Sequence, residues 1–282
     1  MATDARMIDS HAHVASPDIL RFPHSSEFPR AQKFDAPIEA LLQDMDVVGV
    51  ERAVLIQPSL YGFDHSYLLA CLQEHPSRFV GVALADPLDT HFGRRLTSMA
   101  QDAPIRGVRF APLIDPSRPW FAPEAEPFIN MTTDQNLAIC LLISPAQLEQ
   151  SVDWIARHPA SRIVIDHLAR PDLGSDGPEA VLDRLARLAE FPNVWVKLSA
   201  LSELSREPYP HRDTAVWARR ALAAFGPERL MWGSDFPFVS GTERYGASWS
   251  ALRQALEDTS ASARRQISAD TAAEVFRLPV TD

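Results

Sequence analysis

The chain has 282 residues, of which 46% are hydrophobic and 23% charged, a composition typical of a globular protein with a large core. Its formal net charge of −10 argues against a broad phosphate-binding surface, so nucleic acid is not an expected partner. Apolar runs last roughly seven residues at most, which is too short to span a membrane. The first residues contain no apolar run of the kind found in a secretory signal, so secretion is not expected. We expect a cytoplasmic protein without membrane association.

Short apolar or β-branched runs recur in chain order at residues 6–13, 52–58, 79–85, 105–112, 137–143, 162–168, 193–199 and 229–235. Stretches between them, such as "PIEALLQDMDVVG" and "PEAVLDRLARLAEF", space apolar residues three and four apart, as amphipathic helices do. Eight strands alternating with helices predict a parallel sheet closed into a (β/α)8 TIM barrel, one domain spanning residues 1–282. A doubly wound open sheet is the alternative, and it accounts less well for eight evenly spaced repeats.

Connections differ in length at the two ends of the predicted strands. Those from helix to strand are short, as in "HPSR" and "GPER". Several from strand to helix are long, namely residues 14–35, 113–123, 199–210 and 236–246. Because barrel enzymes build their sites from the loops after the strands, we expect the working site at the C-terminal face of the barrel.

Polar side chains stand at the predicted ends of three strands. His11 and His13 are two residues apart in "MIDSHAH", so in an extended strand they share a face. His167 ends the sixth run and Asp235 the eighth. A lone histidine pair also fits two half-exposed residues, and Asp235 also fits a helix N-cap. The four together predict a site on one rim, because imidazoles and a carboxylate can bind a divalent ion or polarise a carbonyl group.

These motifs resemble the amidohydrolase superfamily over nearly the whole chain, in "IDSHAH", "GVRFAP", "IVIDHLARP" and "WGSDFP", and in "ISADTAAEVFRL", which is similar to its closing helix. The pattern is most similar to a branch of lactonases that includes pyrone-dicarboxylate lactonase and sugar-acid lactonases. The resemblance implies a carboxylic ester hydrolase that opens a lactone.

Members with two metals carry a bridging lysine or glutamate on strand four and a histidine on strand five. Here Arg109 and "LAICLLI" stand instead, so we expect one zinc-like ion at most, or none. Its ligands would come from His11, His13, His167 and Asp235.

In the mechanism that this resemblance implies, Asp235 is the general base that activates water against the ester carbonyl. His11, His13 and His167 stabilise the oxyanion, directly or through a metal, and Asp235 then protonates the leaving oxygen.

Arg118 and Arg206 are displaced from the positions where the pyrone-dicarboxylate enzyme has further arginines. We therefore expect a monoanionic or neutral lactone, either a sugar lactone or a muconolactone-like compound. The predicted substrate-binding residues are Arg109, Arg170, Lys197, Tyr61 and Trp120.

The substrate-binding predictions have structural alternatives. Arg170 could pair with Asp172 or Asp166, Lys197 with a rim carboxylate, and the aromatic residues could cover apolar core. For the whole protein, the alternatives are a metal-dependent decarboxylase of an aromatic or enoic acid, a metal-free lactone isomerase, and, ranked last, a barrel that only binds. The sequence leaves open whether the chain forms a homo-oligomer.

Overall fold

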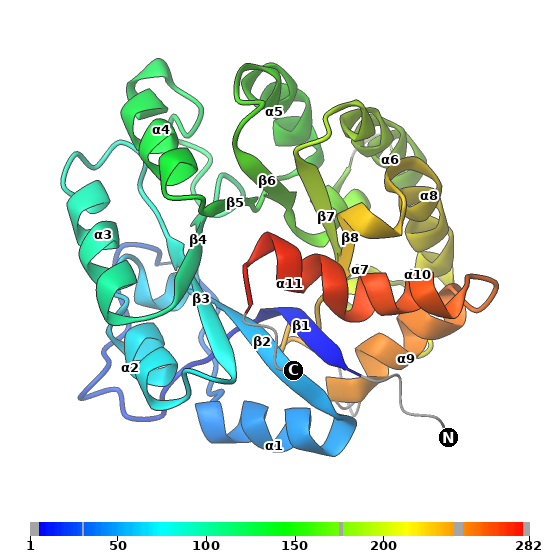
Figure 1. The fold of residues 1–282 in the computed structure, drawn as a ribbon, viewed down its shortest axis with the longest axis horizontal. Coiled ribbons are helices and arrows are strands. Elements are labelled where there is room, and N and C mark those ends of the chain that lie inside the picture. Colours follow the sequence, from blue (N-terminus) through cyan, green and yellow to red (C-terminus); the bar gives the residue numbers. More distant parts are fainter. Residues whose placement is uncertain (1–5, 30, 175–176, 240–244, 279–282) are drawn as a thin grey trace.

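Eight parallel strands form a barrel surrounded by helices in the computed structural model (Figure 1). The structure describes residues 6–29, 31–174, 177–239 and 245–278. Each strand pairs with the next along the chain, in the order β1 to β8, which confirms the predicted single-domain (β/α)8 barrel. The strands are β1 (Met7–Ala12), β2 (Val50–Ile56), β3 (Phe79–Leu84), β4 (Ile105–Phe110), β5 (Ala138–Leu141), β6 (Arg162–Ile165), β7 (Val194–Leu198) and β8 (Leu230–Trp232).

Helices lie mainly on the outside of the barrel, as the amphipathic stretches predict (Figure 1). Local signals set their ends: Ser144 and Gln147 form a capping box that begins α5, and α1 ends at Gly49, which has a φ of 85°. None of the described helices is both long and apolar enough to cross a membrane. The helices are α1 (Ile38–Val48), α2 (Ser66–Glu74), α3 (Phe92–Asp102), α4 (Glu126–Asp134), α5 (Pro145–Arg157), α6 (Gly177–Arg187), α7 (Leu201–Leu204), α8 (Ala215–Phe225), α9 (Tyr245–Ala255), α10 (Ala261–Arg265) and α11 (Thr271–Val275).

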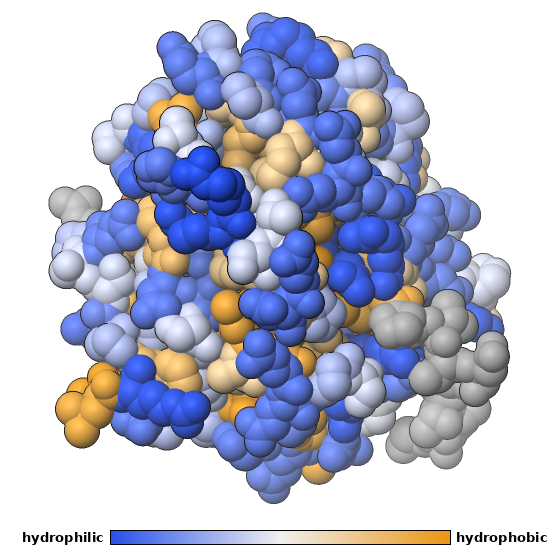
Figure 2. Space-filling model, turned by 60° about the vertical axis from the view of Figure 1, so that its left-hand side comes forward, coloured by the Kyte–Doolittle hydropathy of each residue, from blue (hydrophilic) through white to orange (hydrophobic). Residues whose placement is uncertain are grey.

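The core has two parts, one inside the barrel and one between the strands and the surrounding helices. Inside the barrel, residues such as Val54, Val80 and Met231 pack with Phe276, which follows α11. Figure 1 shows α11 lying across one end of the barrel, so it covers the interior there. The face of the molecule in Figure 2 is largely hydrophilic, with hydrophobic residues in small groups, in keeping with the acidic composition.

The barrel closes through the segment after β8 rather than through β8 alone. Ala12 forms a parallel bridge with Phe236, and the backbone N–H of His13 donates to the carbonyl of Phe236 at 2.7 Å. The N–H of Asp235 donates to the carbonyl of His11 at 2.9 Å. The backbone that carries Asp235 is thereby held against the backbone that carries His11, in β1, and His13, directly after it.

Asp9 reinforces this closure from behind. Its carboxylate accepts hydrogen bonds from the backbone N–H of His11 (3.0 Å), from the N–H (2.9 Å) and hydroxyl (2.5 Å) of Ser234, and from the Tyr245 hydroxyl (2.8 Å). The group is fully buried, and burial raises the pKa of Asp9 even though these donors act in the opposite direction. One carboxylate therefore ties β1, the segment after β8 and α9 together.

Two predicted strands are shorter than expected. β6 ends at Ile165, before His167, and β8 ends at Trp232, before Asp235. Both side chains belong to the turns that follow, where His167 has a φ of 53° and Asp235 a φ of 61°. Of the long connections predicted after the strands, residue 30 and residues 240–244 lie outside the described residues.

We expect Asp9→Ala to lower the free energy of unfolding by at least about 3 kcal/mol, because it leaves several buried donors without an acceptor. Tyr245→Phe, which removes one of these hydrogen bonds, should cost about 1 kcal/mol. Urea unfolding of both variants and the wild type measures the difference. Equal losses in the two variants would contradict the central role of the Asp9 carboxylate.

Candidate active site

A cavity of about 330 Å³ brings together residues that follow different strands of the barrel. Its described lining combines histidine, arginine and carboxylate side chains with an apolar wall. The lining residues include His13, Phe34, Arg109, Leu113, Ile114, Leu142, His167, Arg170, Glu203, Asp235 and Phe238. Three of the expected strand-end residues, His13, His167 and Asp235, therefore line one space, and His11 lies buried behind them.

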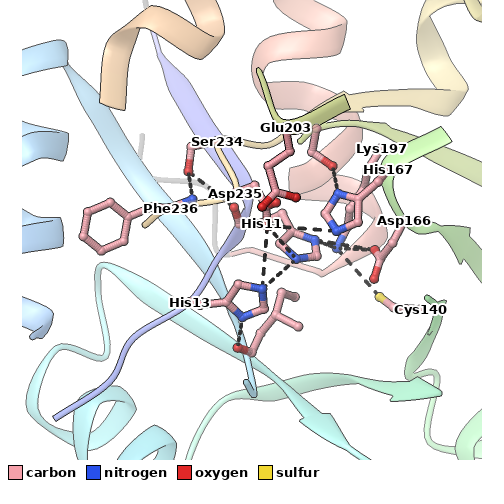
Figure 3. Close-up of polar contacts among 12 residues, drawn as sticks. His11, His13, Cys140, Asp166, His167, Lys197, Glu203, Ser234, Asp235 and Phe236 are labelled. Atoms are coloured by element: carbon pink, nitrogen blue, oxygen red, sulfur yellow. Dashed lines mark hydrogen bonds and ion pairs between the residues drawn. The ribbon is translucent and has the colours of Figure 1, made fainter. Parts of the chain in front are cut away.

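His11 and His13 face each other at the end of β1. Their Nε2 atoms are 3.2 Å apart, and His13 Nδ1 lies 2.8 Å from the carbonyl oxygen of Ile56 (Figure 3). Because a carbonyl only accepts, His13 carries its proton on Nδ1 and presents a lone pair on Nε2. Burial lowers the pKa of His13 to about 3 and holds the pKa of His11 well below its usual value. Both imidazoles are neutral at neutral pH.

His167 and Asp235 complete the cluster. Asp235 Oδ1 lies 3.5 Å from His11 Nε2, 3.7 Å from His13 Nε2 and 4.0 Å from His167 Nε2. The Ser199 hydroxyl, 2.8 Å from His167 Nδ1, fixes the orientation of that ring. Burial, with a further contribution from the Glu203 carboxylate, raises the pKa of Asp235 to about 8. A carboxyl group with a pKa near the working pH is well suited to exchange a proton.

A buried ionic group lies directly behind the histidines. Asp166 Oδ2 accepts from Arg109 Nε at 3.0 Å, and Asp166 Oδ1 pairs with Lys197 Nζ at 3.1 Å. Burial would raise the pKa of Asp166, but Lys197, Arg109 and contacts with His11 hold it well below its usual range. From the sequence, Asp166 was expected only as an ion-pair partner of Arg170. Its place in the site was missed, although an aspartate directly before His167 was a visible signal.

Lys197 does not lie where a substrate-binding residue was expected. Its side chain is fully buried, and Nζ lies 3.1 Å from His11 Nδ1 as well as 3.1 Å from Asp166 Oδ1 (Figure 3). An ammonium group in this place donates to His11 Nδ1, which leaves the proton of His11 on Nε2, pointing at His13. The structure therefore corrects the prediction of substrate contact: Lys197 inside the barrel acts on His11 instead.

The cluster contains the nitrogen and oxygen donors that a zinc-like ion prefers. His11, His167 and Asp235 each offer one ligand atom, and these atoms all lie within 4.8 Å of one another. Asp235 Oδ1 is buried and accepts no hydrogen bond from the described residues. Ligands about 2.0–2.2 Å from a tetrahedral zinc ion stand roughly 3.3 Å apart. The distances from Asp235 Oδ1 to His11 Nε2 (3.5 Å) and to His167 Nε2 (4.0 Å) are somewhat longer, so these side chains would have to close in around one ion. The ion also requires the His11 proton to move to Nδ1, which is 3.5 Å from Asp166 Oδ1.

An ion pair lines the wall above this cluster. Arg170 Nη1 and Nη2 lie 3.4 Å and 3.3 Å from Glu203 Oε2, so Arg170 pairs with neither Asp172 nor Asp166. Glu203 belongs to α7 and extends toward Asp235 in Figure 3. Glu203 was not predicted from the sequence, because an acidic residue in a long loop belongs to no repeating pattern.

Two predicted aromatic contacts lie away from the cavity. The Tyr61 hydroxyl accepts from the backbone N–H of Ser16 at 2.7 Å, and its ring is buried. Trp120 packs on Phe110, and its Nε1 donates to the carbonyl of Asp115 at 2.8 Å. Neither residue is among the described lining of the cavity. Both stabilise the loops instead, which corrects their prediction as pocket residues.

Known lactonases are similar to the chain in sequence. The chain is 30% identical over 234 residues to a 4-sulfomuconolactone hydrolase of Rhizobium radiobacter, covering 81% of this chain and 75% of that protein. It is 34% identical over 195 residues to an L-fucono-1,5-lactonase of Burkholderia ambifaria, covering 67% of this chain and 66% of that protein. The resemblance to lactonases that the motifs indicated is confirmed.

Solved structures share the fold. An amidohydrolase from Burkholderia multivorans, crystallised with bound zinc, has a TM-score of 0.82 at 23% identity and covers 98% of this chain and 100% of that one. The family model described as amidohydrolase matches residues 8–278. Since this match takes in all eight strands and the cluster at their ends, the chain belongs to the amidohydrolase family.

Proposed function

We propose that this enzyme hydrolyses the ester bond of a small lactone, as its relatives' names describe for them. The observation that carries the proposal is the buried Asp235 carboxylate, which faces three imidazole Nε2 atoms within 4.0 Å at the cavity wall. A carboxyl group that can exchange a proton with water, beside imidazoles that can stabilise an oxyanion, is suited to acyl transfer to water.

The proposed reaction uses Asp235 twice. Its carboxylate first takes a proton from a water molecule, whose oxygen attacks the lactone carbonyl carbon. The negative charge then develops on the carbonyl oxygen, where imidazole N–H groups or a bound cation stabilise it. As the tetrahedral intermediate collapses, the bond to the ring oxygen breaks and Asp235 returns the proton to that oxygen. The product is an open hydroxy acid.

We propose one divalent ion, held by His11, His167 and Asp235 with His13 beside them. When bound, such an ion would act as a Lewis acid on the carbonyl oxygen and lower the pKa of a bound water. In the metal-free arrangement, Lys197 donates to His11 Nδ1 and His11 Nε2–H donates to His13 Nε2. Binding of the ion would therefore require the His11 proton to move from Nε2 to Nδ1, and Lys197 would give up its hydrogen bond to that nitrogen.

The substrate lies, in this proposal, against Arg109 and Arg170 in a cavity of about 330 Å³. A small ring fits this volume, and the apolar side chains of Phe34, Leu113 and Phe238 can cover its faces. We propose a sugar lactone or a muconolactone-like compound with at most one anionic group. A cytoplasmic location and the absence of a nucleic-acid partner stay predictions from the sequence.

Asp235→Asn should reduce kcat about 10²- to 10⁴-fold in a folded protein, because the amide cannot accept the proton of the attacking water. Asp46→Asn is the matched control, since Asp46 lies on α1, pairs with Arg78 and is 66% exposed. A panel of lactones followed by acid release measures the effect. Retention of more than a tenth of the wild-type kcat would exclude Asp235 as the general base.

We expect the purified protein to contain one equivalent of zinc-like metal by elemental analysis, and His167→Asn to lower that content. Chelation should abolish ring opening, and added zinc should restore it, if the ion polarises the carbonyl. Full activity after complete metal removal would instead assign polarisation to the imidazoles. Release of carbon dioxide without acid from ring opening would favour the decarboxylase alternative.

A further inference from the structure

The cationic side chains of the cavity already face carboxylates. Arg109 Nε lies 3.0 Å from Asp166, and Arg170 Nη2 lies 3.3 Å from Glu203. Glu203 and Asp235 belong to the lining of the cavity, whereas Asp166 lies behind it. Among the described lining residues, each arginine therefore has an acidic partner, and the cavity is not the strongly positive space that a dianion would need.

The Glu203–Arg170 pair differs from the Asp166–Arg109 pair in its accessibility. The Asp166 side chain is 0% exposed, whereas those of Arg170 and Glu203 are 19% and 28% exposed. A ligand can therefore reach Glu203 while Asp166 stays covered. Glu203 is also placed by the backbone: α7 is a single turn that starts after Ala200, which has a φ of 55°, and the Glu203 N–H donates to the Ala200 carbonyl at 3.1 Å.

The carboxylate of Glu203 repels a carboxylate on a ligand but can accept a hydrogen bond from a hydroxyl group. A carboxylate on the substrate would have to compete with Glu203 for Arg170 and would lie beside a like charge, which is unfavourable at close range. A hydroxyl group, in contrast, can donate to Glu203 and leave its pair with Arg170 intact. The pair thus favours hydroxyl groups over carboxylates at this position.

We infer that Glu203 is a specificity-determining residue that rejects a carboxylate at Arg170 and accepts a hydrogen bond from a ring substituent. The substrate is then a hydroxylated, sugar-type lactone without an anionic group at this position. This inference rests on the proposed lactonase function and narrows its substrate class.

The test compares D-galactono-1,4-lactone with D-galactaro-1,4-lactone, which share a ring and differ in whether the terminal carbon is a hydroxymethyl group or a carboxylate. The wild type should prefer the hydroxymethyl lactone at least tenfold in kcat/KM. Glu203→Gln should reduce this preference at least tenfold, about 1.4 kcal/mol, chiefly through a lower KM for the carboxylated lactone. Glu149→Gln is the matched control, because Glu149 pairs with Arg187 at the same 3.3 Å on the outer surface.

Binding of galactonate and galactarate, measured by calorimetry, gives a second readout that needs no turnover. Galactarate should bind at least tenfold more tightly to Glu203→Gln than to the wild type, while binding of galactonate should not improve. An unchanged preference and an unchanged galactarate Kd in Glu203→Gln would overturn the inference, as would a wild type that prefers the carboxylated lactone. If the wild type opens no lactone of the panel, the proposed function fails, and the calorimetry still decides the role of Glu203.

Discussion

The site depends on two backbone hydrogen bonds that join β1 to the segment after β8. They set Asp235 against His11 and His13, although more than two hundred residues of chain separate the two segments. Close approach is possible because position 233 is glycine: a Cβ there would lie 2.7 Å from the Cβ of His11. The same contact closes the barrel, so the barrel cannot close without bringing the site residues together.

Behind the histidines, the charged side chains inside the barrel pair with one another. Charged groups that a ligand can reach lie only at the cavity. Asp166 is buried together with Lys197 and Arg109, and a buried ion pair loses its hydration unless each charge finds partners. Lys197 gains a second acceptor in His11 Nδ1, and Phe276 lies beneath it, with the ring centroid 5.3 Å from Nζ. Because the ionic group is satisfied within the barrel, it can orient His11 without requiring a substrate.

The sequence predicted the parts of the molecule that follow a repeating physical pattern. The alternation of strand and helix periods predicted the barrel. Because parallel strands end at one rim, their order also predicted that His11, His13, His167 and Asp235 lie together. Patterns say little about which way an isolated side chain points. Lys197 was therefore taken for a rim residue, although β7 directs it into the barrel, and Glu203 was missed because α7 is one turn within a loop.

The turn after β6 shows why the positions of single side chains cannot be predicted from a sequence pattern. Four consecutive residues, His167 to Arg170, have φ values of 52° to 56°, and none of them is glycine. Left-handed backbone costs L-residues roughly 1–2 kcal/mol each, so neighbouring contacts must offset it. Leu168 and Ala169 are fully buried in the core, and their burial offsets part of this cost. Their burial brings His167 and Arg170, on either side of them, to one cavity, where the first faces Asp235 and the second faces Glu203.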